Sequence, residues 1–193
     1  EKYGIELTQA DHDRYLGANL KDIWSDVLER YQVKEEFSHY KLEDFLEDHI
    51  HSSYQGLADK EDLELMPGVE EWFKFFKDHG YKMIIASSSY EPIIKHVYER
   101  FGLDKYMEGY IGANSIENGK PDPEIFIKAA AELGVEPEQT LIIEDSENGV
   151  EGAHAAGAKV VGFNRAQDQS QDLSKADLII KEFNQENLQK ILD

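Results

Sequence analysis

Three short stretches of the 193-residue sequence hold side chains that could bind a phosphate group or a metal ion. Ser87 and Ser88 offer hydroxyls and, if a helix follows them, backbone N–H groups that bind anions. Lys120 stands between a glycine and a proline and could place a positive charge on a phosphoryl group. Glu144 and Asp145 are adjacent carboxylates, the hard oxygen ligands that Mg²⁺ takes one or two at a time.

Each stretch also has an ordinary structural interpretation. Serines and acidic residues are frequent at helix N-termini, where they cap free N–H groups or oppose the helix dipole without any ligand. A single lysine is most often a solvated surface charge. We favour a metal site over a helix cap for the acid pair, whereas the serines fit a cap and an anion site equally well.

The surrounding pattern is one of alternating strands and helices. Apolar runs typical of buried strands end just before the serines and just before the acid pair, and a short strand precedes Lys120. The predicted strands are Tyr81 to Ala86, Tyr110 to Gly112, Thr140 to Ile143, Lys159 to Phe163 and Leu178 to Ile180. This alternation predicts an α/β fold, a Rossmann-like doubly wound parallel sheet with helices on both faces. Open sheets of this kind bind ligands beyond the carboxyl ends of their strands, so the three stretches are expected to meet.

The first third of the chain has a different pattern. Apolar residues there recur at spacings of three and four, which is typical of amphipathic helices with acidic outer faces. Met66-Pro67-Gly68 marks the change of pattern. We therefore expect a small helical domain over 1–64 and an α/β domain over 65–193, with a polar loop over 167–174.

Composition excludes several kinds of protein. The chain has no cysteine, so disulfides, thiolate metal sites and cysteine nucleophiles are ruled out. The net charge of −20 disfavours nucleic acid and anionic membranes as partners. No apolar run reaches the roughly 20 residues that span a bilayer, and no signal-peptide pattern is present. We expect a cytoplasmic protein, and no obligate protein partner is evident.

Taken together, the motifs resemble those of the haloacid dehalogenase-like (HAD) superfamily, in the subgroup of β-phosphoglucomutase and small phosphatases. The stretch ending at Ser87 resembles the second motif of that family, Gly119 to Pro123 the third, and Leu141 to Val150 the fourth. Gly152 to Phe163 is also similar, and the helical first third resembles the family's cap domain.

The resemblance implies a chemistry and a role for each residue. In this family an aspartate attacks the phosphoryl group and forms an aspartyl-phosphate, which water or an acceptor hydroxyl then discharges. Ser87 and the amide of Ser88 would bind the transferring phosphoryl group, and Lys120 would neutralise it. Glu144 and Asp145 would hold Mg²⁺, directly or through water.

The first motif of the family, a buried strand ending in D-x-D-G, is absent from the sequence. Asp11-His12-Asp13 has the spacing, but no apolar strand precedes it and no glycine follows, so we interpret it as a solvated helix start. About 25–30 residues, a strand, a loop and a helix, are expected upstream. Either the sequence is an incomplete record of an active enzyme or it is a truncated form without a nucleophile. We favour the first, because loss of a central strand would expose both of its neighbours.

The type of enzyme depends on the cap. In the resembling mutase a cap arginine grips a distal phosphate, and the matching position here is Leu20, with Asn19 and Lys21 beside it as candidate substrate-contacting residues. Tyr90 similarly stands where the mutase has a lysine. Because this site has fewer cations than that of the resembling mutase, we favour hydrolysis of a small metabolite with one phosphate, such as a sugar phosphate. A β-phosphoglucomutase-like phosphomutase, with Lys21 substituting, and a catalytically inactive binding protein of the same fold remain alternatives.

Overall fold

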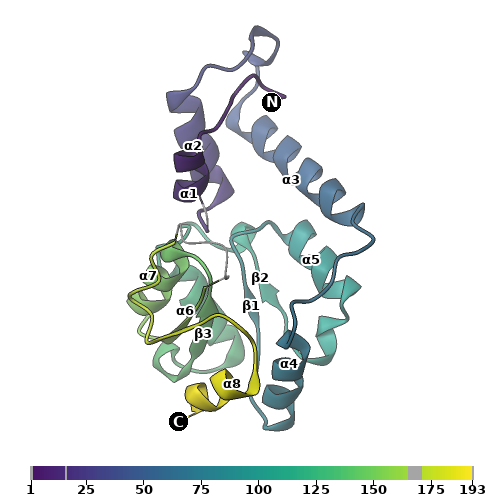
Figure 1. Ribbon diagram of the computed structural model, residues 1–193. Coiled ribbons are helices and arrows are strands. Elements are labelled where there is room, and N and C mark those ends of the chain that lie inside the picture. The colour runs from purple at the N-terminus through teal and green to yellow at the C-terminus, as the bar shows by residue number, and fades with distance from the viewer. Residues whose placement is uncertain (1, 16, 165–170, 193) are drawn as a thin grey trace.

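The computed structural model describes residues 2–15, 17–164 and 171–192, and within them a helical part stands above an α/β part (Figure 1). Of the polar loop predicted over 167–174, residues 167–170 lie outside the described residues, and residues 171–174 form neither helix nor strand. The helices are α1 (Gln9–Tyr15), α2 (Leu20–Arg30), α3 (Leu42–Ala58), α4 (Val69–Asp78), α5 (Glu91–Arg100), α6 (Glu124–Leu133), α7 (Glu147–Ala155) and α8 (Gln185–Leu192). The strands are β1 (Ile85–Ala86), β2 (Tyr110–Ile111), β3 (Leu141–Glu144), β4 (Lys159–Phe163) and β5 (Leu178–Ile180).

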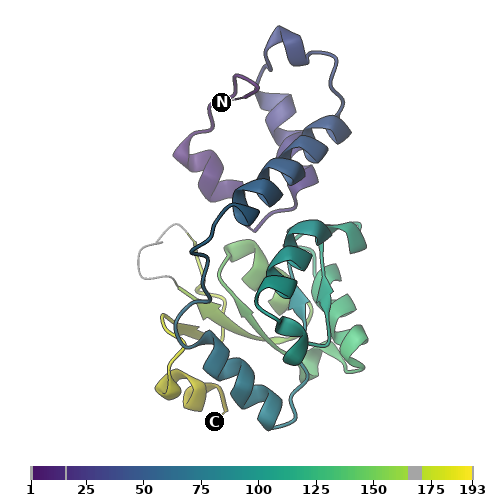
Figure 2. The ribbon, with the colours of Figure 1, turned by 90° about the vertical axis from the view of Figure 1, so that its right-hand side faces the viewer.

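The helical part packs around its own apolar cluster. Trp24 and Val27 of α2 and Phe45 of α3 are buried there together with Ile5. The rings of Trp24 and Phe45 stack with centroids 4.9 Å apart. The three-and-four spacing of the sequence therefore places these residues on one inner face, and α3 then runs down towards the α/β part (Figure 2).

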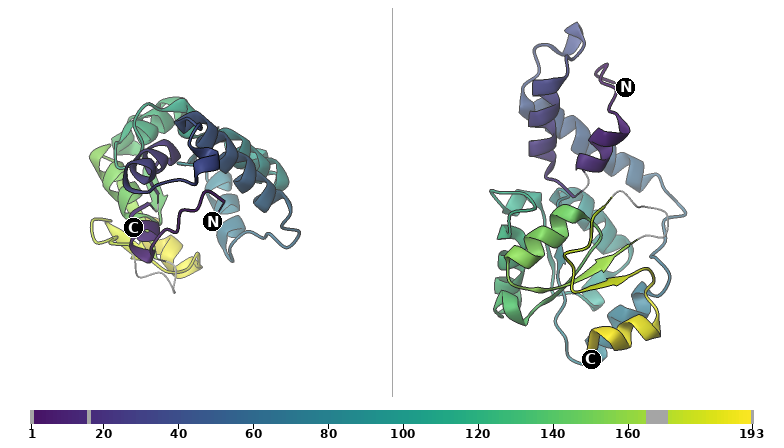
Figure 3. Two further views of the ribbon diagram at one scale, coloured as in Figure 1. Left: turned by 90° about the horizontal axis from the view of Figure 1, so that it is seen from above. Right: turned by 60° about the vertical axis from the view of Figure 1, so that its left-hand side comes forward.

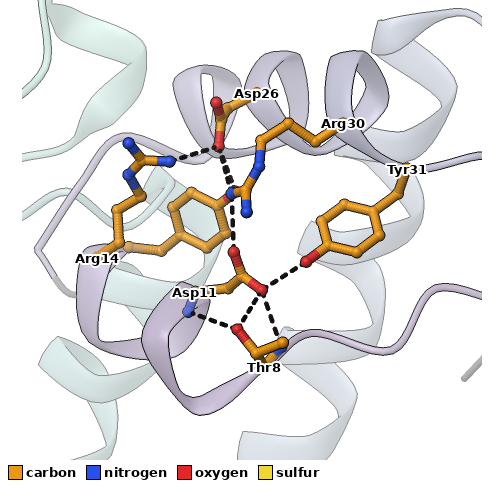
Figure 4. A network of polar contacts seen from close by, with 7 residues as sticks. Thr8, Asp11, Arg14, Asp26, Arg30 and Tyr31 are labelled. Atoms are coloured by element: carbon orange, nitrogen blue, oxygen red, sulfur yellow. Dashed lines mark hydrogen bonds and ion pairs between the residues drawn. The ribbon is translucent and has the colours of Figure 1, made fainter.

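A polar network around the buried Asp11 joins α1 to α2 (Figure 4). The Asp11 carboxylate accepts hydrogen bonds from the Thr8 hydroxyl at 2.6 Å and the Tyr31 hydroxyl at 2.6 Å, and it pairs with Arg30 at 2.7 Å. Thr8, then Tyr31, and also Arg30 hold the pKa of Asp11 far below its usual range. The prediction of a solvated Asp11 was wrong, because only 2% of this residue is exposed. The helix start itself is confirmed.

The α/β part is built from parallel strands, as the sequence predicts. Within the described residues they form two sheets, β1-β2 and β3-β4-β5, and all neighbouring strands are parallel. The predicted ranges of β4 and β5 are those observed, while the strand expected over 81–86 shortens to two residues. Within the described residues, strands β1 and β3 are not paired with each other.

Helices cover both faces of the strands. Phe126 and Ala129 of α6 and Val150 and Ala153 of α7 form one buried cluster. On the other side Trp72 of α4 packs with Phe163 of β4 and Leu188 of α8 in a second cluster, so that α4 and α8 lie side by side (Figure 3). No helix in the described part of the chain is long and apolar enough to cross a bilayer.

Candidate functional site

The carboxyl ends of β1 and β3 and the segment after β2 meet at one point. The Nζ atom of Lys120 lies 3.5 Å from the carbonyl oxygen of Ala86, the last residue of β1. It also forms an ion pair with Glu144, the last residue of β3. The convergence predicted for the three stretches is therefore observed, with Ser87 directly after Ala86 and Asp145 directly after Glu144.

Lys120 is buried rather than solvated. Its side chain is 5% exposed, and its ammonium group lies 4.8 Å from the centroid of the Phe126 ring. A buried ammonium is stable only with a charged or polar partner, which Glu144 supplies. The surface interpretation that a lone lysine would normally take does not apply to Lys120.

Both oxygens of Glu144 are already engaged by protein groups. Oε1 faces Lys120, while Oε2 accepts hydrogen bonds from the backbone N–H of Asp145 at 3.1 Å and from the Ser146 hydroxyl at 3.1 Å. The first turn of α7 makes room for this carboxylate through Gly149. A Cβ atom on Gly149 would lie 2.1 Å from Oε2 of Glu144, so an alanine there would collide with it.

Asp145 is exposed beside the buried Glu144, and the two carboxylates are the acid pair that the sequence proposes for Mg²⁺. The described residues contain no group of three or more histidine, cysteine or acidic side chains that could hold a metal. Mg²⁺ commonly uses one or two protein carboxylates and completes its shell with water and substrate oxygens, so the pair is compatible with it. Glu144 would have to exchange its contact with Lys120 or Ser146 for any ion that it bound directly.

The serines after β1 use some of their hydrogen-bonding groups in contacts within the protein. The N–H of Ser87 bonds to the Ile111 carbonyl at 3.0 Å, which extends the β1–β2 ladder by one residue. Its hydroxyl accepts from the N–H of Ser89 at 3.1 Å, a local turn contact. Neither residue is the N-cap of α5, which is Tyr90. The helix-cap interpretation of Ser87 and Ser88 is therefore wrong, while the anion-site interpretation stays a prediction.

The helical part reaches the site through the loop between α1 and α2. The Ser88 hydroxyl donates to the carbonyl of Gly17 at 2.8 Å. Gly17 has a φ of +73°, and a Cβ atom there would lie 2.3 Å from the Ser146 hydroxyl, so only glycine fits this close approach. This loop closes over the polar end of the strands in the structure.

Asn19 and Lys21 differ in position. Asn19 is 6% exposed and caps α2, with its side chain accepting from the N–H of Lys21 at 2.8 Å. Its Cβ lies 2.4 Å from where a Cβ on Gly119 would be, so Asn19 packs directly on the residue before Lys120. Lys21 is exposed in the first turn of α2.

The start of α5 lies near the same turn of α2. Burial raises the pKa of the Tyr90 hydroxyl, and the nearby Asp22 carboxylate raises it further. A phenol with a pKa raised above its usual value near 10 is neutral at ordinary pH. Tyr90, which the sequence comparison with the mutase singles out, therefore adds no cation to this end of the site.

Glu124 is a positioning residue for the loop before Lys120 that the sequence did not reveal. Its carboxylate accepts from the N–H groups of Glu117 at 3.0 Å and Asn118 at 2.9 Å, and it pairs with Lys128. The Lys128 ammonium and then these two N–H groups lower the pKa of Glu124 to about 2. The loop that leads into Lys120 is thus tied to the first turn of α6. The one sequence signal was an acid at a helix start, which is too common to indicate this role.

The chain was compared with known families, proteins and structures. A family model described as haloacid dehalogenase-like hydrolase matches residues 1–163. A phosphorylated carbohydrates phosphatase of Thermotoga maritima is 30% identical over 157 residues, which cover 81% of this chain and 69% of that protein. A phosphoglycolate phosphatase of Salmonella typhi is 29% identical over 137 residues, or 70% of this chain and 54% of that protein, so the chain spans about half its length. The crystal structure of a β-phosphoglucomutase from Clostridium difficile has the same fold, with a TM-score of 0.82 and 23% identity over 97% of this chain and 82% of that one.

Proposed function

Because the chain belongs to the haloacid dehalogenase-like hydrolase family, we propose that it forms the cap and most of the core of a magnesium-dependent phosphatase for small phosphorylated metabolites. The observation that carries this proposal is the meeting of Lys120, Glu144 and the Ala86–Ser87 strand end at one edge of the parallel strands. The phosphorylated carbohydrates phosphatase, at 30% identity, supports a sugar phosphate as the substrate class.

The proposed role of each core residue follows from its position. Ser87 and Ser88 follow β1, where hydroxyl and N–H groups can bind phosphoryl oxygens. Lys120 supplies the positive charge that an otherwise strongly acidic protein needs next to a phosphate ester, and the burial of its side chain strengthens that charge's effect on a bound anion.

Asp145 and Glu144 would hold Mg²⁺, which when bound reduces the repulsion between an anionic nucleophile and the phosphate. Asp145 is exposed at the strand end and can bind the ion directly. Glu144, anchored by Ser146 and Lys120, would contribute through one of those contacts or after leaving it.

Among the described strand ends, only that of β3 is followed by an aspartate, Asp145. We assign Asp145 to the metal and not to nucleophilic attack. Asp11 and Asp13 lie in α1, and Asp11 is committed to the buried network with Arg30. We therefore place the nucleophile on a strand outside these 193 residues. Residues 1–64 are proposed as the cap, with Asn19 and Lys21 nearest the substrate, and residues 65–193 as the core.

The test is hydrolysis of a panel of phosphorylated sugars by the complete gene product, with and without Mg²⁺. Lys120→Ala should lower turnover roughly 10²–10³-fold, the scale for losing one stabiliser of transition-state charge. The matched control is Lys95→Ala on α5, a lysine that is 60% exposed and should leave turnover unchanged. Equal turnover of the two variants would remove Lys120 from the reaction. Absence of Mg²⁺-dependent hydrolysis across the panel would favour the inactive binding protein instead.

A further inference from the structure

The side chain of Gln171 bridges the helical part and the α/β part. Its amide oxygen accepts a hydrogen bond from the backbone N–H of Glu147, the first residue of α7, at 2.9 Å. Its amide nitrogen donates to the backbone carbonyl of Asp13, near the end of α1, at 3.3 Å. A backbone N–H can only donate and a carbonyl can only accept, so the two partners together fix the orientation of the amide.

Both partners of Gln171 are groups that their own helices leave without a bond. The first four N–H groups and the last four carbonyls of an α-helix have no partner within the helix. Glu147 begins α7, and Asp13 lies in the last turn of α1, which stands above α7 (Figure 1). One amide therefore supplies the acceptor that the core helix lacks and the donor that the helical part lacks.

The turn that Gln171 holds directly follows the acid pair. Ser146, the N-cap of α7, is 2% exposed and donates its hydroxyl to Oε2 of Glu144 at 3.1 Å. Asp145 lies between these two residues. A bond to the N–H of Glu147 therefore restrains the same turn that presents Asp145.

The segment that follows Asp13 is also held against this turn. A Cβ atom on Gly17 would lie 2.3 Å from the Ser146 hydroxyl, and the Ser88 hydroxyl donates to the Gly17 carbonyl at 2.8 Å. The segment leads directly into Asn19, the N-cap of α2. Whatever fixes the end of α1 therefore also fixes the residues of the helical part that lie nearest the strand ends.

We infer that Gln171 is a positioning residue that couples the placement of α1, and of the loop after it, to the turn that presents Asp145. Leu173, two residues later, is 4% exposed in the apolar core and anchors the segment from which Gln171 projects. An ionised carboxylate only accepts and an ammonium only donates, so neither could serve both partners. The effect of Gln171 on turnover rests on the proposed function, whereas the tie between the two parts does not.

Two substitutions separate the two bonds of Gln171. Gln171→Glu still accepts from Glu147 but can no longer donate to Asp13, and Gln171→Ala loses both bonds. The matched control is Gln139, whose amide oxygen accepts from the N–H of Glu136 at 3.1 Å within the α/β part. Amide exchange at Glu147 should be roughly 2- to 10-fold faster in Gln171→Ala, the scale for losing one neutral hydrogen bond, and no faster in Gln171→Glu or Gln139→Ala.

The placement of the helical part is measured between two spin labels. The chain has no cysteine of its own, so Glu36→Cys in the helical part and Glu132→Cys on α6, both exposed positions, can be labelled specifically. Pulsed electron–electron double resonance should give a broader distance distribution in both Gln171 variants than in the unsubstituted chain. Gln139→Ala should leave the distribution unchanged.

Kinetics of the complete gene product separate positioning from a merely structural role. Gln171→Glu should raise the KM for a sugar phosphate roughly 2- to 10-fold at unchanged kcat, because only the placement of the loop before Asn19 is affected. The shift should persist in 1 M salt, which screens charges beyond about 3 Å and so removes the effect of the added carboxylate. Gln171→Ala should raise KM and also lower kcat. A glutamine that only stabilised the fold would lower the amount of active enzyme, and hence the apparent kcat, without changing KM.

Two results would overturn the inference. One is a label distance distribution that stays the same in both Gln171 variants. The other is an active enzyme in which the Gln171 variants have the KM of the Gln139 variants. Absence of hydrolysis by the unsubstituted gene product would instead refute the proposed function, and the exchange and distance measurements would still decide whether Gln171 ties the two parts together.

Discussion

Replacing Gly149 with alanine tests whether the Glu144 carboxylate is held as tightly as the structure shows. The new Cβ would lie 2.1 Å from Oε2 and 2.4 Å from Oε1 of Glu144. Glu144 can move aside only by giving up contacts with Lys120 or with Ser146. We expect Gly149→Ala to destabilise the protein although alanine is the better helix former.

The expected magnitude follows from two opposing effects. Alanine in place of glycine within a helix stabilises by roughly 0.5–1 kcal/mol. Overpacking a filled site costs about 1–3 kcal/mol. The net loss is therefore about 0–2.5 kcal/mol. For a chain of 193 residues each kcal/mol lowers the melting temperature by about 2–4 °C.

The assay is urea unfolding followed by the fluorescence of Trp24, in the helical part, and Trp72, in the α/β part. The matched control is Gly56→Ala in α3, where a new Cβ meets nothing within 4 Å. That variant should be about 0.5–1 kcal/mol more stable than the unsubstituted chain. A Gly149→Ala protein as stable as Gly56→Ala would refute the reasoning, because it would show that the Glu144 carboxylate has room to spare.

Three further predictions concern acid and base behaviour. Because the pKa of Asp11 is low in the folded protein, the contribution of this carboxylate to stability is complete above its ordinary pKa near 3.8 and is lost as pH falls further. The Asp11→Asn variant should therefore unfold more easily at pH 7 and lose less stability on acidification. Glu124, whose pKa is lowered from 4.5 to about 2, should hold the loop before Lys120 with full effect above about pH 4.5 and release it only as pH falls to about 2. Glu124→Gln should speed amide exchange at Asn118 already at pH 7. Burial lowers the pKa of His49, which accepts a hydrogen bond from the Trp24 indole at 3.2 Å. The helical part should therefore lose stability as pH falls below about 6.5. His49→Gln should remove that loss in thermal unfolding between pH 5 and 7.

The apolar runs of β4 and β5 predicted the observed bounds of both strands. β4 lies between two other strands, and its apolar run, Lys159 to Phe163, gave the observed bounds. The run from Tyr81 to Ala86 has the same character, yet two of its residues pair as a strand. Strand β1 pairs only with β2 within the described residues, and β2 is itself two residues long, so the remaining residues of the run have no ladder to join.

The site could be predicted in position but not in its internal contacts. Strand ends and helix starts are local features, which is why Ser87, Lys120 and Glu144 could be selected from the sequence. That Lys120 pairs with Glu144, and that Asp11 pairs with Arg30, depends on residues 24 and 19 positions apart brought together by packing. Periodicity assigns residues to faces and does not say which polar partners meet between faces.

The buried Lys120–Glu144 pair is itself an argument for function. Removing two charges from water costs several kcal/mol per ion, and well-packed apolar residues of similar volume are often as stable as a buried ion pair or more so. The surroundings would suit such residues, since Phe126 lies against Lys120 and the pair sits at the edge of an apolar cluster. Stability alone therefore does not explain why a lysine and a glutamate stand there. The proposed function offers a reason, because a phosphate ester and Mg²⁺ would need a cation and a carboxylate that are charged and held at this point of the fold.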